Sequence, residues 1–537
     1  MHINDLPDEV LSLVIGLVEQ PAQPTRGLWE KAHPVLSICR RWRCIALPIV
    51  YRELFVWCEE SADADCAPSA RPVLTTNAGL VADLGVSCMA RSLCMTVFYS
   101  AGPVSCVERA LDLLRSAGTG HAWSSVRKLD LFIHPVSDDA LADSHEVASL
   151  ACAFAALLPG VVDIHLDDHV SDSFTVAMYR SLVDVYARQL RCLKTSYIWD
   201  SGTQPLARLA HLEVRFDMIR CRAMPGVSLD GLVSLHLAGA ASHRVWHLLA
   251  GSNVREAAFD CLERLHVSYI QDQLPLPVDT ACSSTPALRL AFPRLRDLEV
   301  HNAGDHCPVT TSATLPPAMD TVTLSCTAAA LRRFAAGNPP RTKAVRLAVD
   351  CEDGTDCAGL FILASRLLQR SQQVLDAGLR IDTDRFVSEC RHLDWPQFTR
   401  ITVVQSATRS GVVAIIHRLP QLAELIVCGL DCGLADAAAT QSSPVALPSR
   451  QSLRVLALYF CHSNYTTDAA LAFLASCVQS LAGLELVRVY QLHSDHIVSL
   501  IQSHARAYPH IANVQFDCAD MQIKGQARSL VRMVDSS

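Results

Sequence analysis

Histidine and carboxylate side chains alternate along one predicted strand, and their spacing could support metal chemistry. The residues are Asp163, His165, Asp167 and His169. Side chains two residues apart share one side of a strand, and imidazole and carboxylate groups gathered on one side can ligate a metal ion. In a repeated strand, however, the same positions simply face solvent. We therefore expect solvated side chains here and no metal site.

Four further pairs of histidines or cysteines have spacings that could ligate a metal. They are His243 with His247, His493 with His496, Cys351 with Cys357, and Cys428 with Cys432. None has companion ligands at a fixed spacing, as zinc sites do. Nucleophile-elbow, phosphate-loop, dinucleotide-binding and metalloprotease motifs are also absent from the sequence. We expect no catalytic residue, metal or cofactor, and a hydrolase built on the histidine-rich strands remains a third alternative.

The elements that must position these groups are strands of a repeat. An apolar pattern with spacings of three and then two residues recurs, as in Leu232, Leu235 and Leu237. Its central residues lie 23 positions apart at Leu212 and Leu235, and the spacing to later copies is about 30. Predicted helices, such as 173–190 and 411–419, separate the copies. Strands that alternate with helices predict a parallel sheet.

This pattern resembles leucine-rich repeats of an irregular kind. The resemblance covers about residues 90 to 520 and implies an α/β solenoid with a curved parallel sheet. We assign the solenoid to residues 89–520 and a C-terminal tail to 521–537. The stretches 271–287, 302–319 and 431–450 interrupt the pattern and are expected to be insertions.

A separate signature occupies the first fifty residues. Pro7 is suited to a first helical turn, and acidic residues around it complement the helix dipole. Apolar side chains then recur at helical spacing from Val10. A second predicted helix, 35–49, ends near Pro48. A module this short cannot bury both apolar stripes alone, so we expect it to dock onto a partner.

The Leu-Pro-x-Glu start, followed later by Cys39-Arg40-Arg41-Trp42 and the exit Tyr51 to Leu54, resembles the F-box family. The resemblance implies a short all-helical module, 1–55, that binds the SKP-type adaptor of a cullin-RING ubiquitin ligase. An ordinary N-terminal helical hairpin is the alternative. Residues 56–88 read as a linker, so we expect a chain that begins near Asn77 to keep its fold. The expected adaptor-binding residues are Leu6, Pro7, Glu9, Val10, Leu13, Ile15, Leu36, Cys39 and Trp42.

Composition narrows the classes of partner. Half of the residues are hydrophobic, but no apolar run is long enough to span a bilayer. The start lacks the features of a secretory signal, so we expect a cytoplasmic or nuclear protein whose 22 cysteines are thiols. The formal net charge of −8 provides no basic field for nucleic acid. We expect neither a nucleic-acid nor a membrane partner.

Target recognition is expected on the strand positions that alternate with the buried leucines, among them Asp130 and Phe132. The principal candidates are Arg215, His236, His266, His301, Tyr459, Arg488 and Tyr490. Histidines on successive strands would also make recognition depend on pH. The sequence thus predicts the substrate-recognition subunit of an SCF-type ubiquitin ligase, whose catalysis belongs to other subunits. The alternative is a protein-protein interaction scaffold without a ligase.

Overall fold

The computed structural model describes much of the chain. The described residues are 7–8, 10–11, 39–60, 73–99, 102–118, 122–135, 144–167, 173–196, 206–215, 231–240, 246, 249, 256–269, 289–303, 307–311, 313–337, 339–350, 357–380, 400–403, 407–419, 422–431, 452–460, 484–490, 513–518 and 521–525. The chain divides into two compact units, and each is considered separately. The first unit comprises Met1–Ala240, Leu248–Ser252 and Ala258–Leu262, and the second comprises Ala241–His247, Asn253–Ala257 and Glu263–Ser537.

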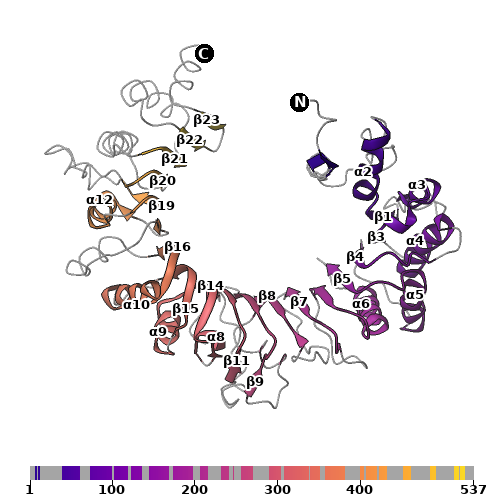
Figure 1. The fold of residues 1–537 in the computed structure, drawn as a ribbon, viewed down its shortest axis with the longest axis horizontal. Coiled ribbons are helices and arrows are strands. Elements are labelled where there is room, and N and C mark those ends of the chain that lie inside the picture. The colour runs from indigo at the N-terminus through magenta and orange to yellow at the C-terminus, as the bar shows by residue number, and fades with distance from the viewer. Residues whose placement is uncertain are drawn as a thin grey trace, which may run out of the picture. The chain divides into compact units, whose positions relative to one another are not determined.

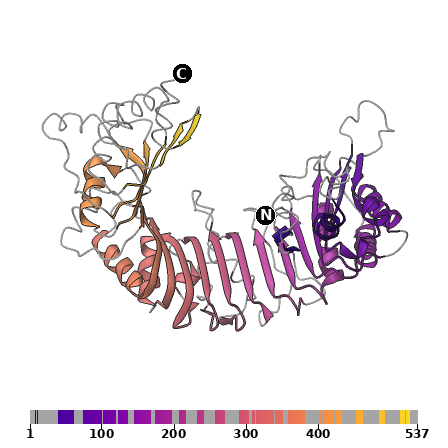
Figure 2. The same cartoon turned by 45° about the horizontal axis from the view of Figure 1, so that its top comes forward.

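The first unit contains one ladder of strands. The strands are β1 (Glu53–Glu59), β2 (Val73–Thr76), β3 (Ser92–Tyr99), β4 (Lys128–Pro135), β5 (Asp163–Asp167), β6 (Cys192–Thr195), β7 (His211–Arg215) and β8 (Ser234–Ala240). From β1 through β3 to β8, each strand pairs in parallel with the next. Strand β2 runs antiparallel on the other side of β1. The strands lie side by side in Figure 2.

Helices lie between successive strands from β2 to β6, and a further helix precedes β1; the helices cover one face of the sheet (Figure 1). They are α2 (Arg40–Val50), α3 (Ala78–Asp83), the 3-10 turn η3 (Ser87–Met89), α4 (Pro103–Ala117), α5 (Ser144–Leu157) and α6 (Ser173–Tyr186). The Tyr179 hydroxyl of α6 donates to the Leu131 carbonyl of β4 and accepts from the Ile133 amide, each at 3.3 Å. This pair of hydrogen bonds fixes the helix against the covered face.

The second unit repeats the arrangement. Its main strands are β10 (Arg264–Tyr269), β12 (Asp297–Ala303), β14 (Ala318–Thr327), β15 (Arg341–Asp350), β16 (Ser371–Arg380), β17 (Arg400–Val403), β18 (Ala407–Thr408), β19 (Glu424–Asp431), β20 (Val455–Phe460), β21 (Leu486–Tyr490), β22 (Asn513–Cys518) and β23 (Met521–Gly525). All pair in parallel except β23, which runs antiparallel to β22. The helices are α8 (Pro308–Thr311), α9 (Ala328–Ala336), α10 (Cys357–Gln369) and α12 (Arg409–Arg418). A small sheet joins β9 (Glu256–Ala258), β11 (Arg289–Ala291) and β13 (Ala313–Thr314).

Alternating burial explains why the apolar pattern forms these strands. On β12, Leu298 and Val300 are at most 1% exposed, whereas Glu299 and His301 between them are half-buried on the opposite face. Successive side chains on a strand point to opposite faces, so one face is apolar and packed. Burying each Leu or Val contributes about 1.5 to 3 kcal/mol. The repeated leucines therefore form the core, and the residues between them form an outward face.

A backbone contact recurs where one strand follows another. The carbonyl oxygen of Arg52 accepts from the amides of Arg91 and Ser92, at 2.7 and 3.2 Å. The carbonyl oxygen of Arg296 accepts in the same way from Asp320 and Thr321, at 2.8 and 3.1 Å. Further carbonyls with this role are those of Arg91, Arg127, Val162, Arg191, Ala210, Glu263, Ala423 and Arg454. The repetition sets a common starting position for the strands within each unit.

The prediction of an α/β protein with parallel strands and intervening helices is confirmed. Apolar triplets such as Leu232, Leu235 and Leu237 are buried at or beside the predicted strands. Predicted helices 173–190 and 411–419 correspond to α6 and α12. The finer assignment to leucine-rich repeats remains a proposal.

The structure does not show an all-helical N-terminal module, since few of those residues are described. Asp8, Val10 and Leu11 are helical, and the Leu11 amide donates to the Pro7 carbonyl at 3.0 Å. Helix α2 ends at Val50, and β1 begins three residues later as a full member of the sheet.

The structure differs from the predicted linker, 56–88, and from the predicted tail, 521–537. The linker range contains the end of β1 together with β2, α3 and η3, and β1 pairs with β3 over seven positions. Leu54, Val56 and Cys58 of β1 are fully buried. Residues 56–88 lack the leucine spacing that marks the other strands. The sequence therefore indicated a linker in this range. At the other end, β23 extends the sheet into the predicted tail.

Candidate functional site

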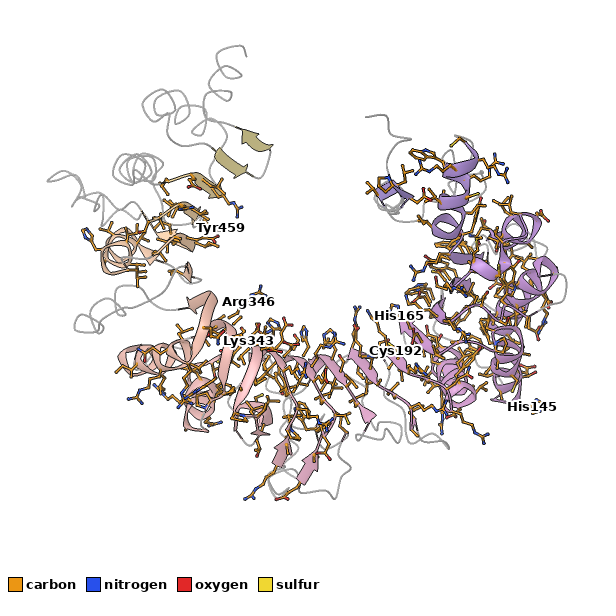
Figure 3. The ribbon with its side chains drawn as sticks, in the orientation of Figure 1. His145, His165, Cys192, Lys343, Arg346 and Tyr459 are labelled. Atoms are coloured by element: carbon orange, nitrogen blue, oxygen red, sulfur yellow. The ribbon has the colours of Figure 1, made fainter. Side chains whose placement is uncertain are left out.

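The outward face of the first unit carries a row of charged and polar side chains. In register from β4 to β8 the row is Asp130, His165, Lys194, Glu213 and His236. Figure 3 shows His165 on the sheet side that faces away from the helices, whereas His145 lies on α5. Because parallel register brings equivalent positions side by side, residues distant in sequence meet on this face.

Asp130 is the most enclosed charge of the row. Its Oδ1 lies 3.0 Å from His165 Nδ1, and its Oδ2 lies 2.7 Å from Lys128 Nζ. Burial alone would raise the pKa of Asp130, but the hydrogen bonds from His165 and Lys128 outweigh it, and the pKa is lowered. Although its position was predicted to face solvent, Asp130 is only 7% exposed, because these neighbours cover it.

Glu213 is the centre of a second group in the same row. Its Oε1 lies 3.1 Å from Lys194 Nζ, 3.3 Å from Arg215 Nε and 3.7 Å from His236 Nδ1. Burial opposes ionisation of Glu213, but Lys194, His236 and Arg215 together lower its pKa. The structure thus gathers two of the predicted target-binding residues, Arg215 and His236, around one carboxylate.

An aromatic cluster flanks the charged row on β1, β3 and β4. Its members are Phe55, Trp57, Phe98 and His134. The rings of Trp57 and Phe98 are centred 4.9 Å apart, and those of Phe98 and His134 are stacked at 4.8 Å. Trp57, Phe98 and His134 are half-buried. Aromatic side chains beside charged groups commonly anchor protein interfaces.

Two cysteine thiols lie next to the charged row. Cys94 is in register with Asp130, and Cys192 lies on β6 two residues before Lys194. Burial, with the nearby carboxylates, raises the pKa of Cys94 to about 12 and that of Cys192 to about 11. A thiol reacts as a nucleophile in its thiolate form. Cys94 and Cys192 therefore stay protonated near neutral pH. Neither of these two thiols supplies a thiolate to the Asp130–His165 pair.

The outward face of the second unit carries the other two predicted histidines. His266 on β10 is in register with Glu299 on β12, and His301 follows two residues later. His266 Nδ1 lies 3.2 Å from Glu299 Oε2, and His301 Nε2 lies 2.7 Å from Glu299 Oε1. The two imidazole rings are centred 5.2 Å apart. His266 and His301 are therefore neighbours, and Glu299 is their shared partner.

The remaining predicted target-binding residues lie further along the second unit. Tyr459 on β20 is in register with Tyr490 on β21, and Ala457 with Arg488. Tyr459 and Arg488 are half-buried. Tyr459 and Arg488 lie on strands separated from β12 by several others, so they are on a different part of the outward face from His266 and His301.

The predicted adaptor-binding residues fall partly within the described chain. Val10 is 38% exposed, Trp42 is 7% exposed, Cys39 is half-buried and Pro7 is exposed. Arg41 Nη2 of α2 lies 2.6 Å from Asp8 Oδ1, which links the two signature segments. Those outside the described residues are Leu6, Glu9, Leu13, Ile15 and Leu36. Adaptor binding by these residues stays a prediction.

The alternating histidines and aspartates do not appear as one group. Asp163 lies in register with Lys128, and burial raises its pKa. His165 pairs with Asp130 instead, and His169 lies outside the described residues. The sequence reading missed the aromatic cluster, although the alternation of Phe55 and Trp57 with Leu54, Val56 and Cys58 is a strand signal.

These features define an α/β protein with a mostly parallel sheet, packed against helices on one face and bearing charged and aromatic groups on the other. No protein-family model matches the chain, and a search of curated proteins gives no match. Among the residues that the structure describes, no helix is long and apolar enough to cross a membrane.

Proposed function

We propose that this protein is a non-enzymatic substrate receptor of a cullin-RING ubiquitin ligase. Its N-terminal segment docks the SKP-type adaptor, and the outward face of its sheet binds a target protein. The ligase subunits that carry out ubiquitin transfer are separate chains. The proposal rests on the resemblance of the N-terminal segment to F-box proteins and on the structural observations that follow.

The observation that carries the proposal is the meeting of the two F-box-like signatures. Asp8 lies in the Leu-Pro-x-Glu segment and Arg41 in the Cys-Arg-Arg-Trp segment, and their side chains form an ion pair at 2.6 Å. Leu11 is fully buried, whereas Val10 beside it is 38% exposed. Exposed ion pairs contribute little to stability. The Asp8–Arg41 pair matters here because it shows that the two signature segments lie close together. A paired segment with an exposed apolar side is suited to docking.

The outward face of the first unit supports a role in target binding. Trp57, Phe98 and His134 provide adjoining half-buried rings, and the Asp130 and Glu213 groups provide charges held by neighbours. Large aromatic side chains supply contact area, and pre-ordered charges supply specificity. The raised pKa values of Cys94 and Cys192 also favour binding over thiol chemistry.

Adaptor binding provides the test. Leu6→Arg places a charge in the first apolar position of the docking segment. Loss of a buried leucine costs about 1.5 to 3 kcal/mol, and an unpaired buried charge costs more, so affinity should fall more than about tenfold. Binding of the purified adaptor to the full chain would be measured by pull-down and titration.

A matched control introduces the same charge elsewhere. Ala148 is exposed on α5, so Ala148→Arg should leave adaptor binding unchanged. Equal adaptor binding by wild type and Leu6→Arg, with both chains folded by circular dichroism, would refute the adaptor assignment.

The second candidate function is a protein-binding scaffold that has no ligase partner. The continuity of α2 with β1 favours it, because the N-terminal segment then caps the sheet and Trp42 is buried within the chain itself. A folded wild-type chain that does not bind the adaptor would select this alternative.

A further inference from the structure

We propose that His266, Glu299 and His301 form a zinc-binding site on the outward face of β10 and β12. The three residues are the group in the described part of the chain whose donor atoms are arranged to hold a metal ion, all within 4.8 Å of one another. The site is independent of the proposed adaptor and of the aromatic cluster in the first unit.

The register of the two strands brings the ligands together. His266 faces Glu299 directly across the ladder, and His301 is two residues beyond Glu299, on the same side of β12. The separations from Glu299 oxygens are 3.2 Å to His266 Nδ1 and 2.7 Å to His301 Nε2. Tetrahedral zinc with ligand bonds near 2.0 to 2.1 Å places its donor atoms about 3.3 Å apart. Small side-chain rotations therefore suffice to admit the ion.

The backbone of β12 is specialised at this point. The pairing of β12 with β14 shifts between Val300 and Ala303, and a bulge of this kind changes the direction of a side chain. Asn302 has a φ of 55°, the one positive φ of a non-glycine among the described residues. Its Nδ2 donates to the Tyr269 carbonyl at the end of β10, at 3.2 Å. The contact ties together the ends of the two strands that carry the ligands.

Buried groups hold Tyr269 in place in turn. Its hydroxyl accepts from Trp246 Nε1 at 3.1 Å and lies 3.2 Å from Cys307 Sγ. Tyr269 and Cys307 are at most 4% exposed, and Trp246 is fully buried. A site supported by rigid neighbours loses less entropy when it binds an ion.

Glu299 supplies the negative charge of the site. Burial alone would raise the pKa of Glu299, but the hydrogen bond from His301 and the charges of His266, His301 and Arg346 lower it. Glu299 is thus an ionised ligand near neutral pH. The positive charge of Arg346 repels a metal ion. Arg346 lies on β15, in the register row Glu299–Thr323–Arg346. Figure 3 shows it on the side of the sheet that faces away from the helices.

Zinc fits this donor set better than calcium or magnesium. Two imidazoles and one carboxylate match zinc preferences, whereas calcium and magnesium select oxygen donors. The side chains of His266, Glu299 and His301 are between 33% and 43% exposed, so the fourth position is open to water or to a carboxylate of a bound molecule. Three protein ligands with one open position are the arrangement of zinc sites that keep a place for water or a bound molecule.

The test measures metal binding by the full chain. Zinc is titrated against a chelating dye, and cobalt(II) is used as a spectroscopic replacement. The wild type should bind zinc at a site whose cobalt spectrum shows nitrogen and oxygen ligands without thiolate charge-transfer bands. The His266→Gln and Glu299→Gln variants should each weaken this site more than about tenfold. Arg346→Gln should strengthen it by removing a repelling charge.

The control variant is His145→Gln, because His145 is an exposed histidine on α5 and belongs neither to the proposed zinc site nor to the charged row. It should leave zinc affinity unchanged. Wild-type cobalt spectra with only thiolate bands, or spectra identical in wild type and His266→Gln, would overturn the proposal. If His266→Gln fails to fold, Glu299→Gln and Arg346→Gln give the same decision, since their effects have opposite signs.

Discussion

Glu213 and Glu299 occupy similar positions in the two units and have different neighbours. Each lies on the outward face, in register with a histidine on an adjoining strand. Glu213 also contacts Lys194 and Arg215, whose charges are permanent near neutral pH. The groups within contact of Glu299 are the imidazoles of His266 and His301, which are charged only when protonated.

Register alone does not create a metal site. The same strand geometry holds both carboxylates, but Lys194 and Arg215 already satisfy Glu213, and a metal ion would have to displace them. The imidazoles of His266 and His301 can instead ligate a metal ion together with Glu299. The identity of one or two neighbouring side chains thus decides whether a carboxylate on this face forms ion pairs or can bind a cation.

Removing β1 should have the largest effect on stability, because the deletion removes part of the core of the first unit. A chain lacking residues 1–60 loses Leu54, Val56 and Cys58, which are fully buried. At about 1.5 to 3 kcal/mol for each large apolar side chain, the free energy of unfolding should fall by several kcal/mol. Chemical denaturation followed by circular dichroism measures the loss.

A shorter deletion, of residues 1–38, keeps α2 and β1 and is the control for that truncation. The sequence alone predicted that a start near Asn77 would be tolerated. Equal stability of the two truncated chains would support the prediction that a start near Asn77 is tolerated. It would contradict the contribution of β1 to stability.

Making Glu299 resemble Glu213 should remove metal binding. Thr323 on β14 is in register with Glu299 and half-buried on the outward face, as Lys194 is beside Glu213. Thr323→Lys would add a permanent positive charge there and should weaken zinc binding more than about tenfold. Thr323→Val, which adds no charge, is the control in the same dye competition. Equal affinities for the two variants would mean that fixed charge does not distinguish the groups.

Removing each carboxylate charge should affect stability unequally. Glu213→Gln leaves Lys194 and Arg215 without their counter-charge and should lower the free energy of unfolding by about 1 kcal/mol. Glu299→Gln, measured without metal at neutral pH, should cost less because an imidazole can still hydrogen-bond to an amide. Urea unfolding of both variants compares them. A larger loss for Glu299→Gln would reverse the comparison.

Acid should weaken the first unit through its lowered carboxylate pKa values, and this effect is the smallest of the four. Asp130 and Glu213 have pKa values below their ordinary 3.8 and 4.5. Their stabilising contribution is complete above those ordinary values and is lost as pH falls through the lowered ones. Glu53, whose pKa is raised chiefly by burial, acts in the opposite sense.

Thermal unfolding between pH 6 and 3 provides the measurement for this prediction. The fall in melting temperature should be smaller in Glu213→Gln than in wild type, because the variant has already lost one of the titrating groups. Parallel curves for the two chains would show that Glu213 does not contribute.

The sequence predicted the repeated parts of the fold and little of what lies between them. Leucine spacing identified β7, β8, β10 and β12, because burial of alternate side chains is encoded locally. It did not identify β1, whose apolar residues are flanked by aromatics on the other face. The pairing of Glu299 with two histidines depends on the register of β10 with β12, and register is a tertiary property. The histidines could be predicted as neighbours, but their shared carboxylate required the structure.

The antiparallel strands β2 and β23 have a consequence for self-association. A parallel repeat sheet presents unpaired amides and carbonyls along an edge strand, where a second copy could extend the sheet. Among the described strands, β2, with four residues, is the N-terminal edge of the first unit, and β23, with five, is the C-terminal edge of the second. Short edge strands offer few hydrogen bonds to an incoming chain. The short strand at each of these two edges therefore limits polymerisation of the repeat there.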